Sequence, residues 1–277
     1  MIDLHLHTTA SDGRSTPADL VREAQAAGIT TMAVTDHDTT AAWEAVSAEA
    51  AARGIACVPG IEITAVEDGR DVHVLGYFFG ARRAPDLEAF LDDQRADRRR
   101  RLVEIIRRLS AIGVAIDVAA LEARQPPGRA LGRPLVAAAL VEAGYVASIA
   151  EAFDRYLSPG RPGFVPRRGA SGADVIERIA RAGGVASLAH PGKLGDEAVV
   201  QRLVAAGLPA IEVHHPDHTP ADTARYRALA TRADLGVTGG SDYHGPGSGR
   251  EDGLGRTRLP EADFERLRAL AAAPRPT

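Results

Sequence analysis

Asp3-Leu4-His5-Leu6-His7 alternates polar and apolar side chains, and this stretch predicts that the chain opens on a β-strand. The strand period of two places Asp3, His5 and His7 on one face and the leucines on the other. Two imidazoles then point in the same direction, close enough to share a metal ion. Ordinary strands often show polar side chains on one face as well, so the pair gains meaning only from the segments that follow.

Further short apolar runs extend this pattern along the chain. Together with the first run they predict seven strands, near residues 2–7, 31–35, 55–63, 72–79, 185–189, 210–214 and 236–240. Between many of them lie Ala-, Arg- and Glu-rich stretches with helical spacing, at 17–27, 40–52, 172–182, 196–206 and 220–233. Alternating strands and helices favour a parallel α/β sheet or barrel.

The alternation stops between residues 81 and 168. Asp86 to Ile112 predicts one long helix, and two more helices are expected near 133–143 and 148–157. Strand signals are scarce there. We therefore expect an α/β barrel built from residues 1–80 and 169–277, with residues 81–168 inserted as a helical cap over the site.

The composition of the 277 residues is that of a soluble protein, with 45% apolar residues, 25% charged residues and a net charge of −4. Cys57 is the single cysteine, which excludes an intrachain disulfide and cysteine-based zinc modules. The N-terminal residues lack a leader pattern, and no apolar run approaches the ~20 residues that span a bilayer. These features predict a cytoplasmic protein without membrane association or an obligate protein partner.

Imidazole and carboxylate side chains recur at the ends of the predicted strands. The carboxyl ends of the strands of a parallel barrel gather on one face, where such enzymes build their sites. Six of the nine histidines are in these positions, namely His5, His7, His37, His73, His190 and His244. The five further segments are Thr35-Asp36-His37-Asp38, Gly60-Ile61-Glu62, Asp71-Val72-His73, Ala189-His190-Pro191 and Gly239-Gly240-Ser241-Asp242-Tyr243-His244.

This mixture of donors favours Zn, Mn or Fe over Ca, which prefers oxygen ligands alone. With Asp12, Glu62 and Asp242 the candidate set reaches nine residues. At three or four ligands an ion, such a set would fill two or three divalent ions if a carboxylate bridges. A multinuclear centre suits phosphoester hydrolysis, because it lowers the pKa of bound water and holds the attacking and leaving oxygens.

The motifs Asp-x-His-x-His-Thr-x-x-Ser-Asp-Gly, Thr-Asp-His-Asp, Gly-x-Glu, Ala-His-Pro and Gly-Ser-Asp-x-His resemble, in order, those of the polymerase and histidinol phosphatase (PHP) superfamily. The resemblance implies a distorted (β/α)7, TIM-like barrel with a trinuclear metal site. It implies that one ion is held by His5, His7, Glu62 and Asp242, a second by Glu62, His73 and His190, and a third by Asp12, His37 and His244. Among these, Asp12, His37, Glu62, His190 and Asp242 are the expected catalytic residues.

The helical insertion and the turn segments around Gly132-Arg133-Pro134 and Gly160-Arg161-Pro162 resemble a smaller bacterial branch of this superfamily. That resemblance implies removal of the 3′-phosphate from nucleoside 3′,5′-bisphosphates, such as adenosine 3′,5′-bisphosphate to AMP, by attack of metal-bound hydroxide on phosphorus. It also implies trimming of 5′-phosphorylated short RNA. The expected substrate is therefore a nucleotide or a short oligoribonucleotide.

The substrate's phosphate groups need cationic partners. Arg133, Arg155, Arg161 and Lys193 are the candidates, because they lie in or beside these turn segments and arginine binds phosphate bidentately. His215 follows another strand end and is the candidate that protonates the leaving group. The long predicted helix carries seven more arginines that we expect to form a solvated face, namely Arg95, Arg98, Arg99, Arg100, Arg101, Arg107 and Arg108.

Two alternatives share the same metal-binding pattern. One is a histidinol-phosphate phosphatase, which needs a pocket for a small amino alcohol. The other is a non-enzyme, a regulatory domain that keeps the metal ions for stability.

Overall fold

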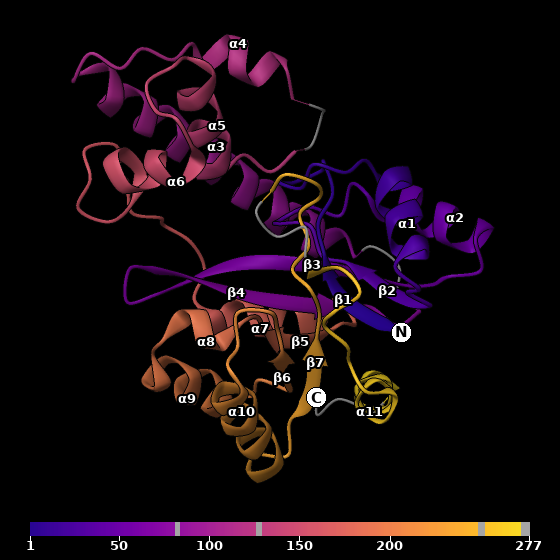
Figure 1. Cartoon of the computed structure of the whole chain (residues 1–277). Helices are drawn as coiled ribbons and strands as arrows, with labels where there is room; N and C mark the ends of the chain where they lie inside the picture. Colours follow the sequence, from indigo (N-terminus) through magenta and orange to yellow (C-terminus); the bar gives the residue numbers. More distant parts are fainter. Residues whose placement is uncertain (81–83, 126–128, 249–252, 273–277) are drawn as a thin grey trace.

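Seven strands form one mixed sheet, hydrogen-bonded in chain order and nearly closed into a barrel (Figure 1). The computed structural model describes residues 1–80, 84–125, 129–248 and 253–272. The start of the predicted insertion, at residues 81–83, and the end of the predicted barrel, at residues 273–277, lie outside the described residues. The strands are β1 Ile2–Leu6, β2 Thr31–Val34, β3 Ala56–Glu67, β4 Arg70–Tyr77, β5 Val185–Leu188, β6 Ala210–His214 and β7 Gly236–Gly239. A parallel bridge between Leu6 and Tyr243 joins the end of β1 to the segment that follows β7.

Helices cover the outside of this barrel, as the sequence predicts. They are α1 Pro17–Ala26, α2 Trp43–Ala52, α7 Gly172–Arg181, α8 Pro191–Leu194, α9 Glu197–Ala205, α10 Pro220–Arg232 and α11 Glu261–Ala272. Helix α7 shows why they form: Ser171 and Asp174 make a capping box at its start, and Val175 and Ile179 are buried in the core. The short helix α8 and the last helix α11 were not among the predicted elements.

The expectation of a parallel sheet is wrong at β4, which runs antiparallel to both of its neighbours, β3 and β5. Strands β3 and β4 are joined by Asp68 and Gly69, both with a left-handed backbone (φ 50° and 74°). Two consecutive residues of this kind form the tight turn of a β-hairpin, and a hairpin forces antiparallel pairing. The reversal brings His73, near the beginning of β4, to the same end of the barrel as the carboxyl ends of the parallel strands.

The insertion between β4 and β5 is helical, and the long predicted helix is confirmed. Its helices are α3 Pro85–Ser110, α4 Val118–Ala123, α5 Arg133–Glu142, α6 Ile149–Ala152 and the π-helix η1 Phe153–Leu157. They enclose an apolar cluster of their own, which includes Leu102, Leu109 and Leu140. Figure 1 shows them gathered on one side of the sheet. The division of the chain into two units with these boundaries stays a prediction.

Within the described part of the chain, no helix is both long enough and apolar enough to cross a membrane. The expected cytoplasmic location and the absence of an obligate partner stay predictions.

Candidate metal centre

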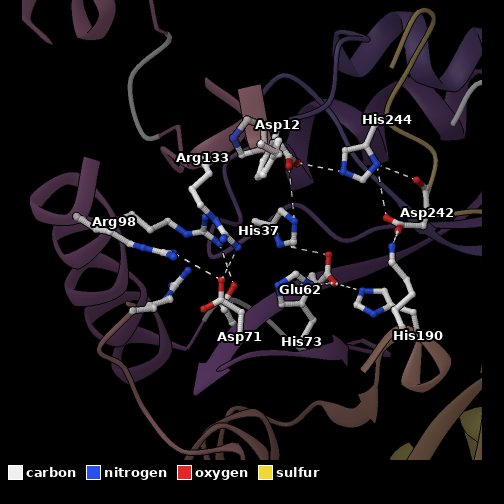
Figure 2. A pocket seen from close by; sticks show the side chains of 16 residues that line it. Asp12, His37, Glu62, Asp71, His73, Arg98, Arg133, His190, Asp242 and His244 are labelled. Atoms are coloured by element: carbon white, nitrogen blue, oxygen red, sulfur yellow. Dashed lines mark hydrogen bonds and ion pairs between the residues drawn. The ribbon is translucent and has the colours of Figure 1, made fainter. Parts of the chain in front are cut away.

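The nine predicted metal-binding residues come together at one end of the barrel. Figure 2 shows those of them that line the cavity. Their positions follow from the strands that carry them. His5 lies in β1, Glu62 in the middle of the long strand β3, and His73 in the reversed strand β4. The other six lie in segments that directly follow strands: His7 and Asp12 after β1, His37 after β2, His190 after β5, Asp242 and His244 after β7.

Glu62 lies at the middle of this cluster. Its carboxylate is buried, and imidazoles from five different histidines surround it. The distances are 3.2 Å to Oε2 from His5 Nε2, His7 Nε2 and His37 Nδ1, 2.8 Å to Oε1 from His73 Nδ1, and 3.1 Å to Oε1 from His190 Nε2. A carboxylate that faces this many ring nitrogens is suited to bind metal together with them.

Two further carboxylates extend the cluster on either side of Glu62. Asp242 Oδ1 lies 3.3 Å from His7 Nε2 and 3.5 Å from His5 Nε2. Asp12 lies 3.2 Å from His244 Nε2 and 3.8 Å from His37 Nε2. Four overlapping groups of three or four donor atoms result, among them His5-His7-Glu62-Asp242 and His7-Asp12-His37-His244.

The chemistry of these donors fits divalent ions. Both ring nitrogens of His7 and the Nδ1 atoms of His37 and His73 are buried without a hydrogen bond, although carboxylate oxygens lie nearby. Buried polar groups normally have a hydrogen-bond partner. These nitrogens have none among the described residues, and a bound metal ion would supply the missing partner. His244 donates from Nδ1 to the carbonyl of Asp242 at 2.8 Å, and this tautomer directs the lone pair of Nε2 toward Asp12.

Glu212, in the middle of β6, supports the centre from behind and was missed in the sequence. It is fully buried, lies 3.0 Å from His5 Nδ1, and accepts the backbone N–H of His190 at 2.7 Å. Burial raises the pKa of Glu212, but the nearby charge of His5 outweighs this effect, and the pKa falls to about 2. The carboxylate is therefore ionised at neutral pH. The available signal was a charged residue inside an otherwise apolar strand, since a buried charge needs a partner.

The backbone of the centre is strained where two of the predicted ligands lie. His190 has φ 29° and Asp242 has φ 51°, in the left-handed region that residues other than glycine rarely adopt. Gly240 is required for a related reason: a Cβ there would lie 2.3 Å from Cβ of His5, so no other residue fits between the two strands. The Gly-Ser-Asp motif thus brings Asp242 against the first strand.

His215 lies behind the centre rather than in the cavity. Its side chain is 1% exposed, and its Nε2 lies 3.3 Å from Asp242 Oδ2. The backbone N–H of Asp217 donates to His215 Nδ1 at 3.1 Å, so the neutral ring carries its proton on Nε2 and donates to Asp242. This geometry fits a residue that orients Asp242, and the expected role of His215 in protonating the leaving group stays a prediction.

Arginines line the other end of the same cavity (Figure 2). Arg98 and Arg167 both donate to the buried carboxylate of Asp38, at 2.5 and 2.8 Å. Arg133 and Arg101 lie 3.2 and 3.5 Å from Asp71. Although burial raises the pKa of Asp38, the charges of Arg98 and Arg167 hold it well below its usual value.

The expectation of a solvated face on the long helix is therefore wrong for three of its arginines, of which Arg95 is 19% exposed and donates to the carbonyl of Asp38. The side chains of Arg98 and Arg101 are only 10% and 11% exposed, because the helix turns this face toward the barrel. Arg100 and Arg107 are each 69% exposed, as expected. Arginines three residues apart on this helix, such as Arg98 and Arg101, thus face the barrel, while Arg100 between them faces solvent.

The remaining substrate-binding candidates also include one residue that lines the cavity and two that lie on the surface. Lys193 lines the cavity at its metal end, with Nζ 3.4 Å from Asp242 Oδ2. Arg155 and Arg161 lie on the outer surface of the insertion, where they pair with Glu151 and Asp154 and are about half exposed. The structure does not bring these two arginines to the cavity.

A buried cluster of imidazoles and carboxylates at one end of an α/β barrel, beside a wall of arginines, defines the class of metal-dependent phosphoesterases. The chain belongs to the PHP domain family, whose model matches residues 3–142.

Curated relatives support this assignment over most of their length. The chain is 35% identical to a 3′,5′-nucleoside bisphosphate phosphatase of Chromobacterium violaceum, over 91% of this chain and 90% of the relative. It is 37% identical to the 5′-3′ exoribonuclease Rnm of Escherichia coli, over 88% and 85%. It is 38% identical to a phosphoribosyl 1,2-cyclic phosphate 1,2-diphosphodiesterase of Eggerthella lenta, over 88% and 94%.

The solved structures agree on the fold. A candidate metal-dependent phosphoesterase from Bifidobacterium adolescentis superimposes with a TM-score of 0.87 at 32% identity, over 97% of this chain and 95% of that one. The distorted TIM-like barrel expected from the sequence is thereby confirmed. Because the named relatives are phosphatases and phosphodiesterases, the chain is a phosphoric ester hydrolase, and the non-enzyme alternative falls away.

Proposed function

We propose that this enzyme hydrolyses the 3′-phosphate of nucleoside 3′,5′-bisphosphates, for example adenosine 3′,5′-bisphosphate to AMP. One observation carries the proposal: the candidate metal centre and the arginine wall line a single cavity of about 310 Å³. A substrate with two phosphate groups on one ribose would use both ends at once. The bisphosphate phosphatase among the relatives supports the same substrate class.

The charges at the arginine end suit a phosphate group. Among the described residues there, the four guanidinium groups of Arg98, Arg101, Arg133 and Arg167 face two carboxylates, Asp38 and Asp71. An excess of two positive charges remains. A phosphomonoester carries a charge of roughly −1.5 to −2 near neutral pH, so the 5′-phosphate of the substrate would balance this end of the cavity.

At the other end we propose two or three divalent ions, of Mn, Zn or Fe. The residues that would hold them are His5, His7, Asp12, His37, Glu62, His73, His190, Asp242 and His244. Such ions supply Lewis acidity toward the phosphoryl oxygens and lower the pKa of water, which an in-line displacement at phosphorus requires.

The chain's own residues would prepare the substrate for this reaction. Lys193, at the rim beside Asp242, is placed to bind a phosphoryl oxygen. Helix α5 and the π-helix η1 contribute Arg133, Pro134 and Phe153 to the cavity wall. The predicted insertion, residues 81–168, would thus act as a cap that orients the nucleotide and limits the access of water.

The test is phosphate release from adenosine 3′,5′-bisphosphate with added Mn²⁺, with the nucleotide product identified. We expect AMP, and we expect slower turnover of 3′-AMP, which lacks the 5′-phosphate that the arginine end would bind. Histidinol phosphate and phosphoribosyl 1,2-cyclic phosphate are assayed in parallel. Faster turnover of either compound than of the bisphosphate would contradict the proposal and assign the cavity to that substrate.

A further inference from the structure

The two carboxylates at the arginine end of the cavity are held in different ways. Asp38 is fully buried, and its Oδ2 accepts hydrogen bonds from Arg98 at 2.5 Å and from Arg167 at 2.8 Å. Its Oδ1 accepts the backbone N–H of Thr64 at 2.9 Å. A buried charge with several short hydrogen bonds is a fixed part of the structure, because moving it would leave buried charges unpaired.

Asp71 lines the cavity itself, where Figure 2 shows it below the guanidinium groups. Its side chain is 22% exposed, and its Oδ2 lies 3.2 Å from Arg133 and 3.5 Å from Arg101. An ion pair that is longer and open to water is weaker than a buried one. A competing anion that enters the cavity can therefore displace this carboxylate.

The two arginines that contact this carboxylate also have other partners. Arg101 Nε donates to the backbone carbonyl of Val165 at 2.8 Å. The guanidinium group of Arg133 lies over two aromatic rings, 5.8 Å from the centroid of Phe153 and 6.0 Å from that of Phe164. These contacts would keep both guanidinium groups at the cavity if the carboxylate moved away.

The proposed reaction leaves one phosphate group unchanged. The 5′-phosphate of the bisphosphate would bind at the arginine end, and the product AMP keeps it. The same guanidinium groups would thus hold substrate and product. Interactions that are equal in substrate and product do not speed the chemical step, and they slow the release of the product. A device that weakens this binding would therefore help turnover.

We propose that Asp71 is an internal competitor for the 5′-phosphate: its carboxylate gives up Arg101 and Arg133 when the substrate binds and returns to them as AMP leaves. This inference rests on the proposed function. The carboxylate carries one negative charge and a phosphomonoester roughly 1.5 to 2 near neutral pH, so the phosphate displaces it. The exchange lowers the net affinity of the arginine end and selects a phosphate group over singly charged anions.

The experiment measures inhibition by AMP during hydrolysis of adenosine 3′,5′-bisphosphate with Mn²⁺. Asp71→Asn removes the competing charge and keeps the shape of the side chain. We expect the inhibition constant of AMP to fall roughly 10-fold, because the phosphate no longer meets a like charge. Asp154→Asn is the matched control, since Asp154 also pairs with an arginine, Arg161, but on the surface of the insertion. It should leave the inhibition constant unchanged.

The sign of the effect separates competition from a structural role. If Asp71 only held the arginines in place, Asp71→Asn would bind AMP more weakly, so a higher inhibition constant overturns the inference. An unchanged value overturns it as well. Arg133→Gln should bind AMP more weakly than wild type, and AMP binding that does not depend on Arg133 also contradicts the exchange.

Failure of the proposed function is recognised separately, as absence of bisphosphate hydrolysis by the wild-type enzyme. The exchange is then judged by calorimetric titration of the Mn²⁺-loaded enzyme with AMP. Tighter binding of AMP to Asp71→Asn than to wild type supports the exchange, and equal or weaker binding rejects it.

Discussion

The two ends of the main cavity hold their charges in opposite ways. At the metal end, the carboxylates of Asp12, Glu62 and Asp242 are surrounded mainly by imidazoles, several of whose nitrogens have no hydrogen bond. At the arginine end, each carboxylate contacts two guanidinium groups, and positive charge remains in excess. The first end needs cations to be complete, whereas the second is already assembled by the chain alone.

This difference separates two functions in one cavity. Because the metal end would act on the reacting phosphate, a change there should reduce turnover of every phosphoester. Because the arginine end would bind only the second phosphate, a change there should affect only substrates that carry one. Substitutions at the two ends can therefore be told apart by comparing substrates.

The largest effect is expected from Asp242→Asn. The loss of one negative ligand should lower kcat for all phosphoesters by roughly 10³-fold. The fold should persist, since asparagine has the same shape and tolerates the left-handed backbone at this position. Phosphate release and thermal unfolding are the measurements. Asp234→Asn is the matched control, because Asp234 has φ 55° and its side chain is 95% exposed. Wild-type kcat in Asp242→Asn would remove Asp242 from the centre.

A smaller effect is expected from Glu212→Gln, which weakens the support behind the metal end. The hydrogen bonds of this carboxylate to His5 and to the backbone of His190 orient both predicted ligands. We expect metal affinity to fall by roughly 10- to 100-fold, measured by competition for Mn²⁺ with a chelator. Glu177→Gln, at an exposed position on α7, serves as the control. A lower Tm with unchanged Mn²⁺ affinity would mean that Glu212 stabilises the fold only.

The smallest effect is expected from Arg133→Gln at the arginine end. One charge-assisted hydrogen bond to the second phosphate is lost, so KM for adenosine 3′,5′-bisphosphate should rise about 10-fold. KM for 3′-AMP should not change, because this substrate has no 5′-phosphate. Arg155→Gln, on the surface of the same insertion, should leave both KM values unchanged. An equal rise of KM for both substrates would show that Arg133 does not bind the 5′-phosphate selectively.

The sequence was informative where the relevant residues are neighbours along the chain. His5 lies in the first strand and His7 directly follows it, and His37, His190 and Asp242 directly follow apolar runs, so the strand pattern alone indicated where they would meet. The reversed strand β4 was missed, although Asp68 and Gly69 between two apolar runs are a strong hairpin signal. His73 lies inside this reversed strand rather than at the end of a parallel one, and it still contacts Glu62 at 2.8 Å.

The helix α3 marks the limit of such reasoning. Its sequence predicts a long helix with many arginines, and this is what forms. Whether Arg98 enters the cavity while Arg100 faces water depends on the rotation of the helix against the barrel, which the buried carboxylate of Asp38 helps to set. Arg167 joins the same carboxylate from 129 residues away in the chain.

By itself, then, the sequence determined the barrel, its helical insertion and the residues of the candidate metal centre, because strand and helix periods are local and each strand end carries its own ligand. Only the tertiary structure decided which arginines face the substrate, that Glu212 supports two of the ligands, and that Asp71 lines the cavity while Asp38 is buried. These features depend on contacts between segments far apart in the chain, and such contacts leave no periodic pattern in the sequence.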